Sequence, residues 1–239
     1  MQTEQIGPLR AHLTNDRTGP GPTVVLLHGF GAPGTDLVGL ASELRAPANT
    51  CFVFPEAPLT IDVGLPPPYL GRAWWLIDMM RLQAAAMSQS YEALARHVPE
   101  GLTHARQLLS DFLDALEVRL NLRDLRDSPL VIGGFSQGAM LSCDLVLRSP
   151  RNFAGLIVFS GSLIAQDEWA AKLDERAPLP FFQSHGRQDP ILPFALAERL
   201  HGLLTGRGWP GRFVTFEGGH GIGREALDGA GEFLCQVLQ

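Results

Sequence analysis

The sequence of 239 residues has very little lysine and no long apolar run. Lys172 is the only lysine among the 19 basic residues, and the arginines are scattered singly, so no basic cluster follows a nucleic-acid backbone. No apolar run approaches the roughly 18 residues that span a bilayer, and the N-terminus lacks a basic start followed by an apolar core. We therefore expect a cytoplasmic protein that binds no nucleic acid and has no stable membrane insertion.

Cysteine is also scarce, and the patterns typical of metal and phosphate sites are missing. Cys51, Cys143 and Cys235 are far apart and lie in apolar patterns, which indicates buried free thiols rather than disulfides. The sequence contains no H-x-x-x-H, no C-x-x-C and no G-x-x-x-x-G-K-[ST]. We therefore expect neither a metal ion nor a cofactor.

Apolar residues, in contrast, make up 45% of the chain, which is ample for one continuous core. Apolar runs predict strands at residues 8–15 (an edge strand), 23–27, 51–54, 129–132, 153–159, 180–184 and 212–216. Helical periodicity predicts helices at residues 35–45, 102–120, 137–148, 194–204 and 226–238. This alternation predicts an α/β fold, with a mostly parallel sheet and helices on both faces, as a single domain over residues 1–239.

Residues 58–100 interrupt the alternation with a Pro-Pro-Pro run at 66–68 and several tryptophans and methionines. We interpret this segment as a lid-like insertion over the sheet. Its large apolar side chains are candidates for an acyl-binding site, although packing in an ordinary core explains each of them as well. These candidate substrate-binding residues are Trp74, Trp75, Met79 and Met80.

A nucleophile motif stands between the predicted strand at 129–132 and the predicted helix at 137–148. Gly134, Ser136 and Gly138 have the G-x-S-x-G spacing of a nucleophile elbow, in which the serine occupies a strained turn from strand to helix. A serine hydroxyl is a poor nucleophile at neutral pH and needs a base and an acid that orients the base. The chain order in such folds is serine, acid, histidine, and Asp189 and His220 follow two later predicted strands in that order.

Other residues compete for the role of the acid. Asp167 follows the predicted strand at 153–159, the first strand after the helix at 137–148, and Asp174 and Glu217 are further rivals. Two histidines, His28 and His185, precede the serine or the acid in their motifs and are expected to shape loops. We favour Asp189 because its loop follows a predicted parallel strand directly.

An earlier glycine-rich loop at residues 29–34 matches G-x-G-x-x-G, and Glu56 follows about twenty residues later, as in a dinucleotide-binding site. Pro33 removes an amide that a pyrophosphate would need, which disfavours a nicotinamide-dependent oxidoreductase. In a hydrolase, the same loop supplies an oxyanion hole. Its two backbone amides would be those of Phe30 and of Gln137, the residue after the serine.

Four stretches together resemble the phospholipase/carboxylesterase family of α/β-hydrolases, which includes bacterial carboxylesterases and acyl-protein thioesterases. They are Leu27-His28-Gly29-Phe30-Gly31, Gly134-Phe135-Ser136-Gln137-Gly138-Ala139, His185-Gly186-Arg187-Gln188-Asp189 and Gly219-His220-Gly221-Ile222. By this resemblance Ser136, Asp189 and His220 match the catalytic triad, and Phe30 and Gln137 the oxyanion positions. The resemblance implies hydrolysis of carboxylic esters, thioesters or lysophospholipids, and homodimers in some members.

The hypothesis is therefore a serine hydrolase that acts on a small acyl ester or thioester through an acyl-enzyme intermediate. One alternative is a catalytically silent relative that binds an acylated ligand or partner. The other is the nicotinamide-dependent oxidoreductase. The sequence departs from the resembled family at Gly31-Ala32-Pro33-Gly34, where Asp-Thr-Gly is frequent, and in the long segment between Trp75 and Glu100.

Overall fold

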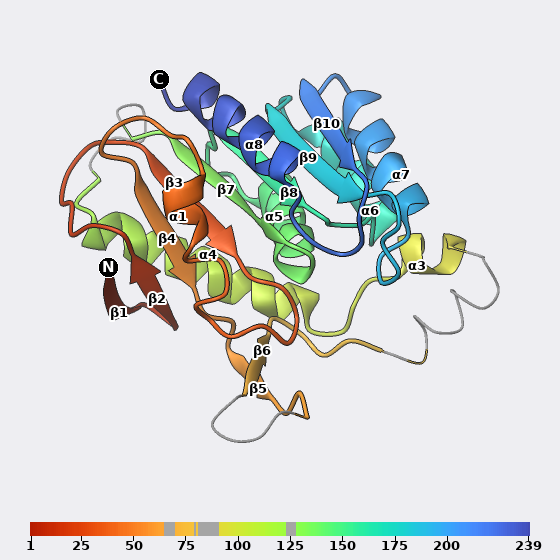
Figure 1. Cartoon of the computed structure of the whole chain (residues 1–239), viewed down its shortest axis with the longest axis horizontal. Helices are drawn as coiled ribbons and strands as arrows, with labels where there is room; N and C mark the ends of the chain where they lie inside the picture. Colours follow the sequence, from red (N-terminus) through yellow and green to blue (C-terminus); the bar gives the residue numbers. More distant parts are fainter. Residues whose placement is uncertain (65–69, 79, 81–90, 123–127) are drawn as a thin grey trace.

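The computed structural model describes residues 1–64, 70–78, 80, 91–122 and 128–239, and its centre is an eight-stranded sheet (Figure 1). The strands lie in the spatial order β1 (Gln2–Ile6), β2 (Leu9–Leu13), β4 (Cys51–Pro55), β3 (Thr23–Leu27), β7 (Leu130–Phe135), β8 (Gly155–Phe159), β9 (Phe181–Gly186) and β10 (Gly211–Phe216). The pairs β1/β2 and β2/β4 are antiparallel, and the other neighbours are parallel. A separate antiparallel pair joins β5 (Leu59–Ile61) to β6 (Gly71–Ala73).

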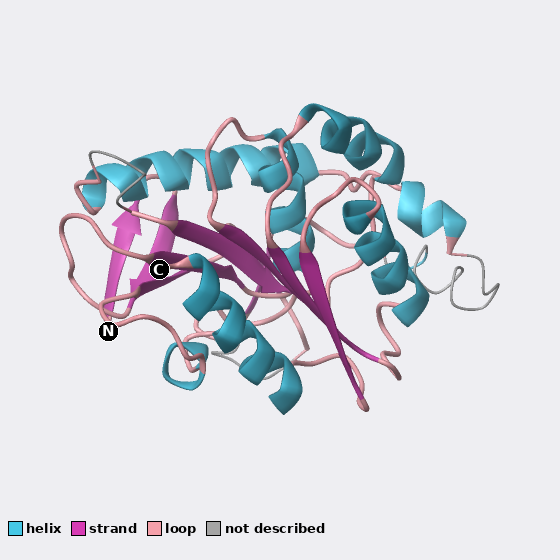
Figure 2. Ribbon diagram, turned by 90° about the horizontal axis from the view of Figure 1, so that it is seen from above, coloured by secondary structure: helices cyan, strands magenta, loops and turns pink. Residues whose placement is uncertain are grey.

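Helices cover both faces of the sheet (Figure 2). Their buried side chains form two apolar clusters, one on each face. One cluster includes residues of α3 (Glu92–Arg96), α4 (Leu102–Arg119), α5 (Gln137–Arg148), α6 (Gln166–Glu175) and α7 (Phe194–Thr205). The other includes α8 (Arg224–Val237) and the region around α1 (Leu40–Glu43). These layers confirm the predicted α/β fold. Among the described residues, no helix is long and apolar enough to cross a membrane.

The inner parallel strands β3, β7 and β8 are buried on both faces, which explains why they are continuous apolar runs in the sequence. Every residue of β3 and β8 is buried, as is all of β7 except its last residue. The predicted strands at 23–27, 51–54, 129–132 and 153–159 are therefore present, with boundaries within a few residues of those expected.

The predicted helix at 35–45 is wrong for most of its length, because only α1 (Leu40–Glu43) is helical there. The preceding residues form turns with i to i−3 hydrogen bonds, such as those from Asp36 N–H to Pro33 and from Val38 N–H to Thr35. Glycine favours such turns over a helix, and Gly39 stands directly before α1.

The predicted edge strand at 8–15 is also not at the edge. It corresponds to β2, which lies between β4 and β1, and β1 forms the true edge of the sheet. A tight turn at Gly7, whose φ is +53°, joins the two strands. Only Ile6 is buried in β1, so the strand has no apolar alternation by which the sequence would reveal it.

All three cysteines are free, in agreement with the sequence. Cys51 and Cys143 are buried, and burial raises the pKa of both thiols. Cys235 is only half-buried, because it lies on the outer part of the C-terminal helix α8.

Candidate active site

Ser136 lies at the turn between β7 and α5, in a backbone conformation that few side chains adopt. Its φ is +54° and its ψ is −116°. The turn is anchored by hydrogen bonds from Ser136 N–H to the carbonyl of Phe159 and from Met140 N–H to the carbonyl of Ser136. A strained residue held at the end of a central strand is typical of a functional position.

Two glycines on either side of Ser136 allow α5 to pack directly on β3. A Cβ atom at Gly134 would lie 2.4 Å from the carbonyl oxygen of Leu27, and one at Gly138 would lie 2.2 Å from the same atom. Only glycine fits at either position, because both contacts are to backbone that cannot move aside. The G-x-S-x-G spacing therefore has a packing cause in this structure.

A continuous chain of hydrogen bonds joins three residues that are far apart in the sequence. His220 Nε2 lies 2.9 Å from Ser136 Oγ, and His220 Nδ1 lies 2.7 Å from Asp189 Oδ2. The carboxylate can only accept, so Nδ1 carries the proton that it donates, and Nε2 accepts from the serine hydroxyl. This arrangement places a base in contact with a nucleophile and a carboxylate behind the base.

Asp189 follows β9 and is held by more than His220. Its side chain is fully buried, and its Oδ1 accepts the backbone N–H groups of Ile191 and Leu192 at 2.8 and 2.9 Å. Burial raises the pKa of this carboxyl, but hydrogen bonds from His185, His220 and Leu192 outweigh burial and hold the pKa below its usual range. Asp189 is therefore a fixed negative charge behind the imidazole of His220.

His185 supports the same carboxylate from the other side. Its Nε2 lies 3.1 Å from Asp189 Oδ2 and 2.9 Å from the carbonyl oxygen of Leu192. Both neighbours are acceptors, so Nε2 carries a proton that the two oxygens share. His185 thus shapes its loop, as expected, by linking the carboxylate of Asp189 to the carbonyl of Leu192.

The rival acids lie away from His220 on the surface. Asp167, in the first turn of α6, pairs with Arg96 at 3.3 Å, and Asp174 pairs with Arg207 at 3.0 Å. Glu217 accepts a hydrogen bond from Gln188 at 2.9 Å. All three carboxylates are largely exposed to solvent.

The loop after β3 brings the backbone of Phe30 to the same end of the sheet as Ser136, because β3 and β7 are parallel neighbours. The neighbouring Gly31 N–H donates to the carbonyl of Arg72 at 2.8 Å, and Arg72 N–H donates to Ala32 at 3.0 Å, so β6 holds the loop in place. Among the described residues, neither Phe30 N–H nor Gln137 N–H has a hydrogen-bond partner within the protein. Two unpaired amides next to a nucleophile suit an oxyanion.

His28 fixes the start of this loop. Its Nδ1 donates to the carbonyl of Gly29 at 2.8 Å, and its Nε2 accepts the backbone N–H of Ala57 at 3.0 Å. Burial lowers the pKa of His28, which favours the neutral ring that this pairing requires. The expected role of His28 in shaping the loop agrees with these contacts.

Glu56, the residue that resembles a ribose-binding acid in the sequence, is occupied within the protein. Its buried carboxylate pairs with His12 at 2.9 Å and with Arg72 at 2.9 Å. Its side chain also packs against Gly34, where a Cβ would lie 2.3 Å from Glu56 Cγ. Glu56 therefore braces the loop after β3, which explains its position without a dinucleotide.

Sequence reasoning missed the side chain of Gln137. Its Oε1 accepts the backbone N–H of Trp74 at 2.9 Å, and its Nε2 donates to the carbonyl of Trp75 at 2.8 Å. These bonds tie the residue after the serine to the segment that follows β6. No local pattern could reveal them, because they join positions more than 60 residues apart.

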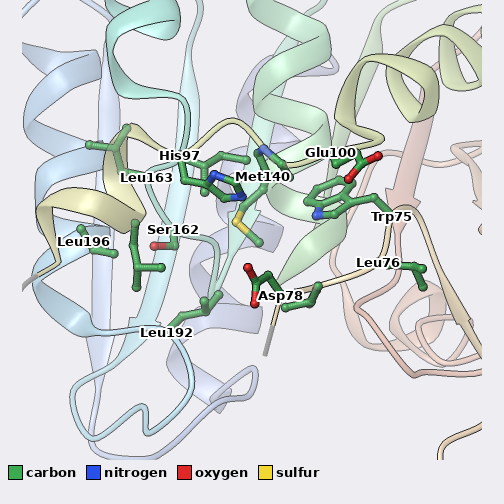
Figure 3. A pocket seen from close by; sticks show the side chains of 14 residues that line it. Trp75, Leu76, Asp78, His97, Glu100, Met140, Ser162, Leu163, Leu192 and Leu196 are labelled. Carbon is green, nitrogen blue, oxygen red and sulfur yellow. The ribbon is translucent and has the colours of Figure 1, made fainter. Parts of the chain in front are cut away.

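A cavity of about 380 Å³ is lined by segments that hold this arrangement, although Ser136, Asp189 and His220 are not on its described wall (Figure 3). Trp75 and Met140 line it, and Met140 is one helical turn beyond Ser136. Leu192, whose N–H binds Asp189, lines it as well.

The four candidate substrate-binding residues differ in their relation to this cavity. Trp75 is on its wall, whereas Trp74 is buried away from it and donates its Nε1–H to the carbonyl of His28 at 3.0 Å. Met80 is 81% exposed and is not part of the described wall. Met79 lies outside the described residues. Trp74 therefore has the packing role that the sequence left open.

Comparison with known proteins identifies the family. The family model for phospholipase/carboxylesterase matches residues 11–238. The chain belongs to this family.

Individual relatives agree with this membership. The acyl-protein thioesterase 1 of Neurospora crassa is 28% identical over 226 residues, which are 90% of this chain and 86% of that protein. The protein of the same name from Kluyveromyces lactis is 31% identical over 197 residues, which are 78% of each chain. The crystal structure of esterase PE8 superposes with a TM-score of 0.76 at 30% identity and covers 96% of this chain and 99% of its own. These relatives agree with membership of a family of carboxylesterases and thioesterases.

Proposed function

We propose that the protein hydrolyses carboxylic esters or thioesters by way of a covalent acyl-enzyme, with Ser136 as the nucleophile, His220 as the general base and acid, and Asp189 as the residue that orients His220. The observation that carries the proposal is the continuous hydrogen-bond chain, 2.9 Å from serine to imidazole and 2.7 Å from imidazole to carboxylate. The names of the relatives, esterase and acyl-protein thioesterase, support the same class of substrate.

The proposed reaction begins when Ser136 Oγ attacks the acyl carbon while its proton passes to His220 Nε2. The developing oxyanion accepts the backbone N–H groups of Phe30 and Gln137, and the amino end of α5 adds a partial positive charge on the same side. His220 then gives the proton to the leaving alcohol or thiol. Water then attacks the acyl carbon and loses a proton to His220, which returns the proton to Ser136 Oγ as the bond from the acyl carbon to Oγ breaks and the acid leaves.

Asp189 contributes by remaining ionised throughout. The hydrogen bonds that hold its pKa below the usual range keep its charge behind the imidazolium that forms in each half of the reaction. Each oxyanion donor contributes on the order of 3 kcal/mol of transition-state stabilisation. The two backbone amides, together with the pair of Asp189 and the His220 imidazolium, are therefore the main sources of rate enhancement in this proposal.

A fluorophosphonate probe tests the proposal, because it reacts covalently with an activated serine and not with an ordinary one. We expect one label per chain, at Ser136 by peptide mass spectrometry, and a reaction slower by at least about tenfold in His220→Ala, in which the serine keeps its place but loses its base. Absence of labelling in the wild-type protein would contradict the proposal and favour the silent relative that binds an acylated ligand.

A further inference from the structure

One hydroxyl group on the cavity wall has no hydrogen-bond partner among the described residues. Ser162, in the loop after β8, lines the cavity and is only 1% exposed. Among the residues that the structure describes, no group forms a hydrogen bond with its Oγ. Figure 3 shows this oxygen among the side chains of the wall, on the side of Leu196 and Leu192.

Two other buried serines, Ser160 and Ser142, do not share this feature. Ser160 Oγ donates to the carbonyl of Gly221 at 2.6 Å, and Ser142 Oγ donates to the carbonyl of Gly138 at 2.9 Å. A buried hydroxyl without a partner costs free energy, and native proteins leave few such groups. A group on a cavity wall regains that free energy when the occupant of the cavity supplies the missing partner.

The rest of the described wall indicates the chemistry of this occupant. Leu163, Leu192 and Leu196 surround Ser162 with apolar side chains, so most of the occupant is apolar. A charged group placed among these apolar side chains would lose its hydration, and a single serine hydroxyl does not compensate for that loss. The partner of Ser162 is therefore a neutral oxygen.

We propose that Ser162 is a specificity residue that binds a hydroxyl or carbonyl oxygen carried by the apolar part of the substrate. The inference rests on the proposed function and names its substrate class: esters or thioesters whose cavity-bound portion is mainly hydrocarbon with one neutral oxygen at a fixed position. A plain hydrocarbon chain in the same cavity leaves the Ser162 hydroxyl unpaired and is a poorer substrate.

Matched pairs of esters test this selectivity. Each pair has the same carbon skeleton, with and without one hydroxyl or keto group, and the oxygen is moved one carbon at a time. One series carries the oxygen in the acyl portion and the other carries it in the alcohol portion, so that the test also identifies which portion enters the cavity.

In the wild-type protein we expect kcat/KM for the best oxygenated ester to exceed that for its plain partner by about tenfold, the usual effect of one buried hydrogen bond. Ser162→Ala should remove this preference while leaving kcat/KM for the plain ester nearly unchanged. A wild-type protein with no preference at any position, or a preference that survives in Ser162→Ala, would overturn the inference.

Ser184→Ala is the matched control. Ser184 Oγ is likewise buried and without a partner among the described residues, but Ser184 is not on the described wall of the cavity. The substitution removes the same atom from a similar environment. We expect Ser184→Ala to keep the preference of the wild-type protein, and an equal loss of preference in both variants would count against a direct contact at Ser162.

Binding to an inactive protein separates this inference from the proposed function. If the wild-type protein hydrolyses none of the esters, the proposed function fails. Calorimetric Kd values for the same pairs on Ser136→Ala, with and without Ser162→Ala, then still decide the role of Ser162. About tenfold tighter binding of the oxygenated ester that depends on Ser162 supports the inference, and equal Kd values for each pair refute it.

Discussion

The position of Asp189 between two histidines is a central feature of the site at the scale of single residues. One carboxylate oxygen accepts from both His220 and His185, and the other accepts two backbone N–H groups. Four donors leave the carboxylate little freedom to rotate. Three of these donors, those of His185, His220 and Leu192, also lower the pKa of Asp189, so they fix both its position and its charge.

This arrangement predicts an effect of His185 on acid stability. His185→Phe keeps a ring in the buried space but removes one donor, so the pKa of Asp189 should rise toward its usual value. A carboxyl whose pKa is depressed in the folded state contributes stability above its unfolded pKa, about 3.9, and loses it as the pH falls toward the folded pKa. The acid-side loss of unfolding free energy should therefore begin near the same pH in both proteins, but in His185→Phe it should be smaller and should end at a higher pH.

Urea unfolding at a series of pH values from about 7 to about 3 measures this difference. His185→Gln is the matched control, because the glutamine amide nitrogen can reach the position of the imidazole Nε2 and keep the donor. Its pH profile should lie close to that of the wild-type protein. Superimposable pH profiles for His185→Phe and the wild-type protein would show that His185 does not act on Asp189.

At the scale of elements, the close contact of α5 with β3 sets the position of the elbow. Gly138, in the first turn of α5, lies against the backbone of Leu27 and His28, where a Cβ would be 2.2 and 2.7 Å from their carbonyl oxygens. Because both contacts are to backbone, a Cβ at Gly138 would push the start of α5, and with it Ser136, away from β3. Gly202, in α7, is the opposite case, because nothing would lie within 4 Å of a Cβ there.

Alanine at these two glycines should have effects of opposite sign. We expect Gly138→Ala to lower the free energy of unfolding by about 3 kcal/mol through overpacking. Gly202→Ala should raise it by about 0.5 to 1 kcal/mol, because alanine is the better residue in the middle of a helix. Denaturant midpoints at unchanged slope measure both effects, and a neutral Gly138→Ala would show that the contact is not required.

The elements with periodic apolar residues could be predicted from the sequence, and those without could not. The strands β3, β7 and β8 are buried throughout and are visible as apolar runs. The edge strand β1 is mostly exposed, and the short pair β5 and β6 has three residues in each strand, so neither has a local signal. Residues 35–39 belong to a stretch with apolar residues at near-helical spacing. Their backbone hydrogen bonds hold them in turns instead of a helix.

At the scale of the whole molecule, the sheet brings the site residues together at the carboxyl ends of its parallel strands. Phe30, Ser136, Asp189 and His220 follow the parallel strands β3, β7, β9 and β10, and such strands place ligands at their carboxyl ends. Strand order and chain order together therefore suggested which residues could meet. The residues that brace the site, such as Gln137 through its side chain and Glu56, depend on contacts between distant segments and carry no sequence signal of their own.

A single domain with a lid-like insertion at 58–100, a cytoplasmic location and a homodimer remain predictions from the sequence. Membership of the phospholipase/carboxylesterase family supports the proposal that the substrates are esters or thioesters. The hydroxyl of Ser162 on the cavity wall has no partner among the described residues. It is the basis for the narrower substrate class that we propose for this chain.

The most direct test of the central claim is kcat/KM for short-chain aryl esters in four proteins: wild type, Ser136→Ala, Asp189→Asn and Asp167→Asn. Asp189→Asn favours the wrong tautomer of His220 and should lose about 10⁴-fold, with at least as large a loss in Ser136→Ala. Asp167→Asn alters a surface pair with Arg96 and should stay near the wild-type value. Equal rates in Ser136→Ala and wild type, or a larger loss in Asp167→Asn than in Asp189→Asn, would contradict the account.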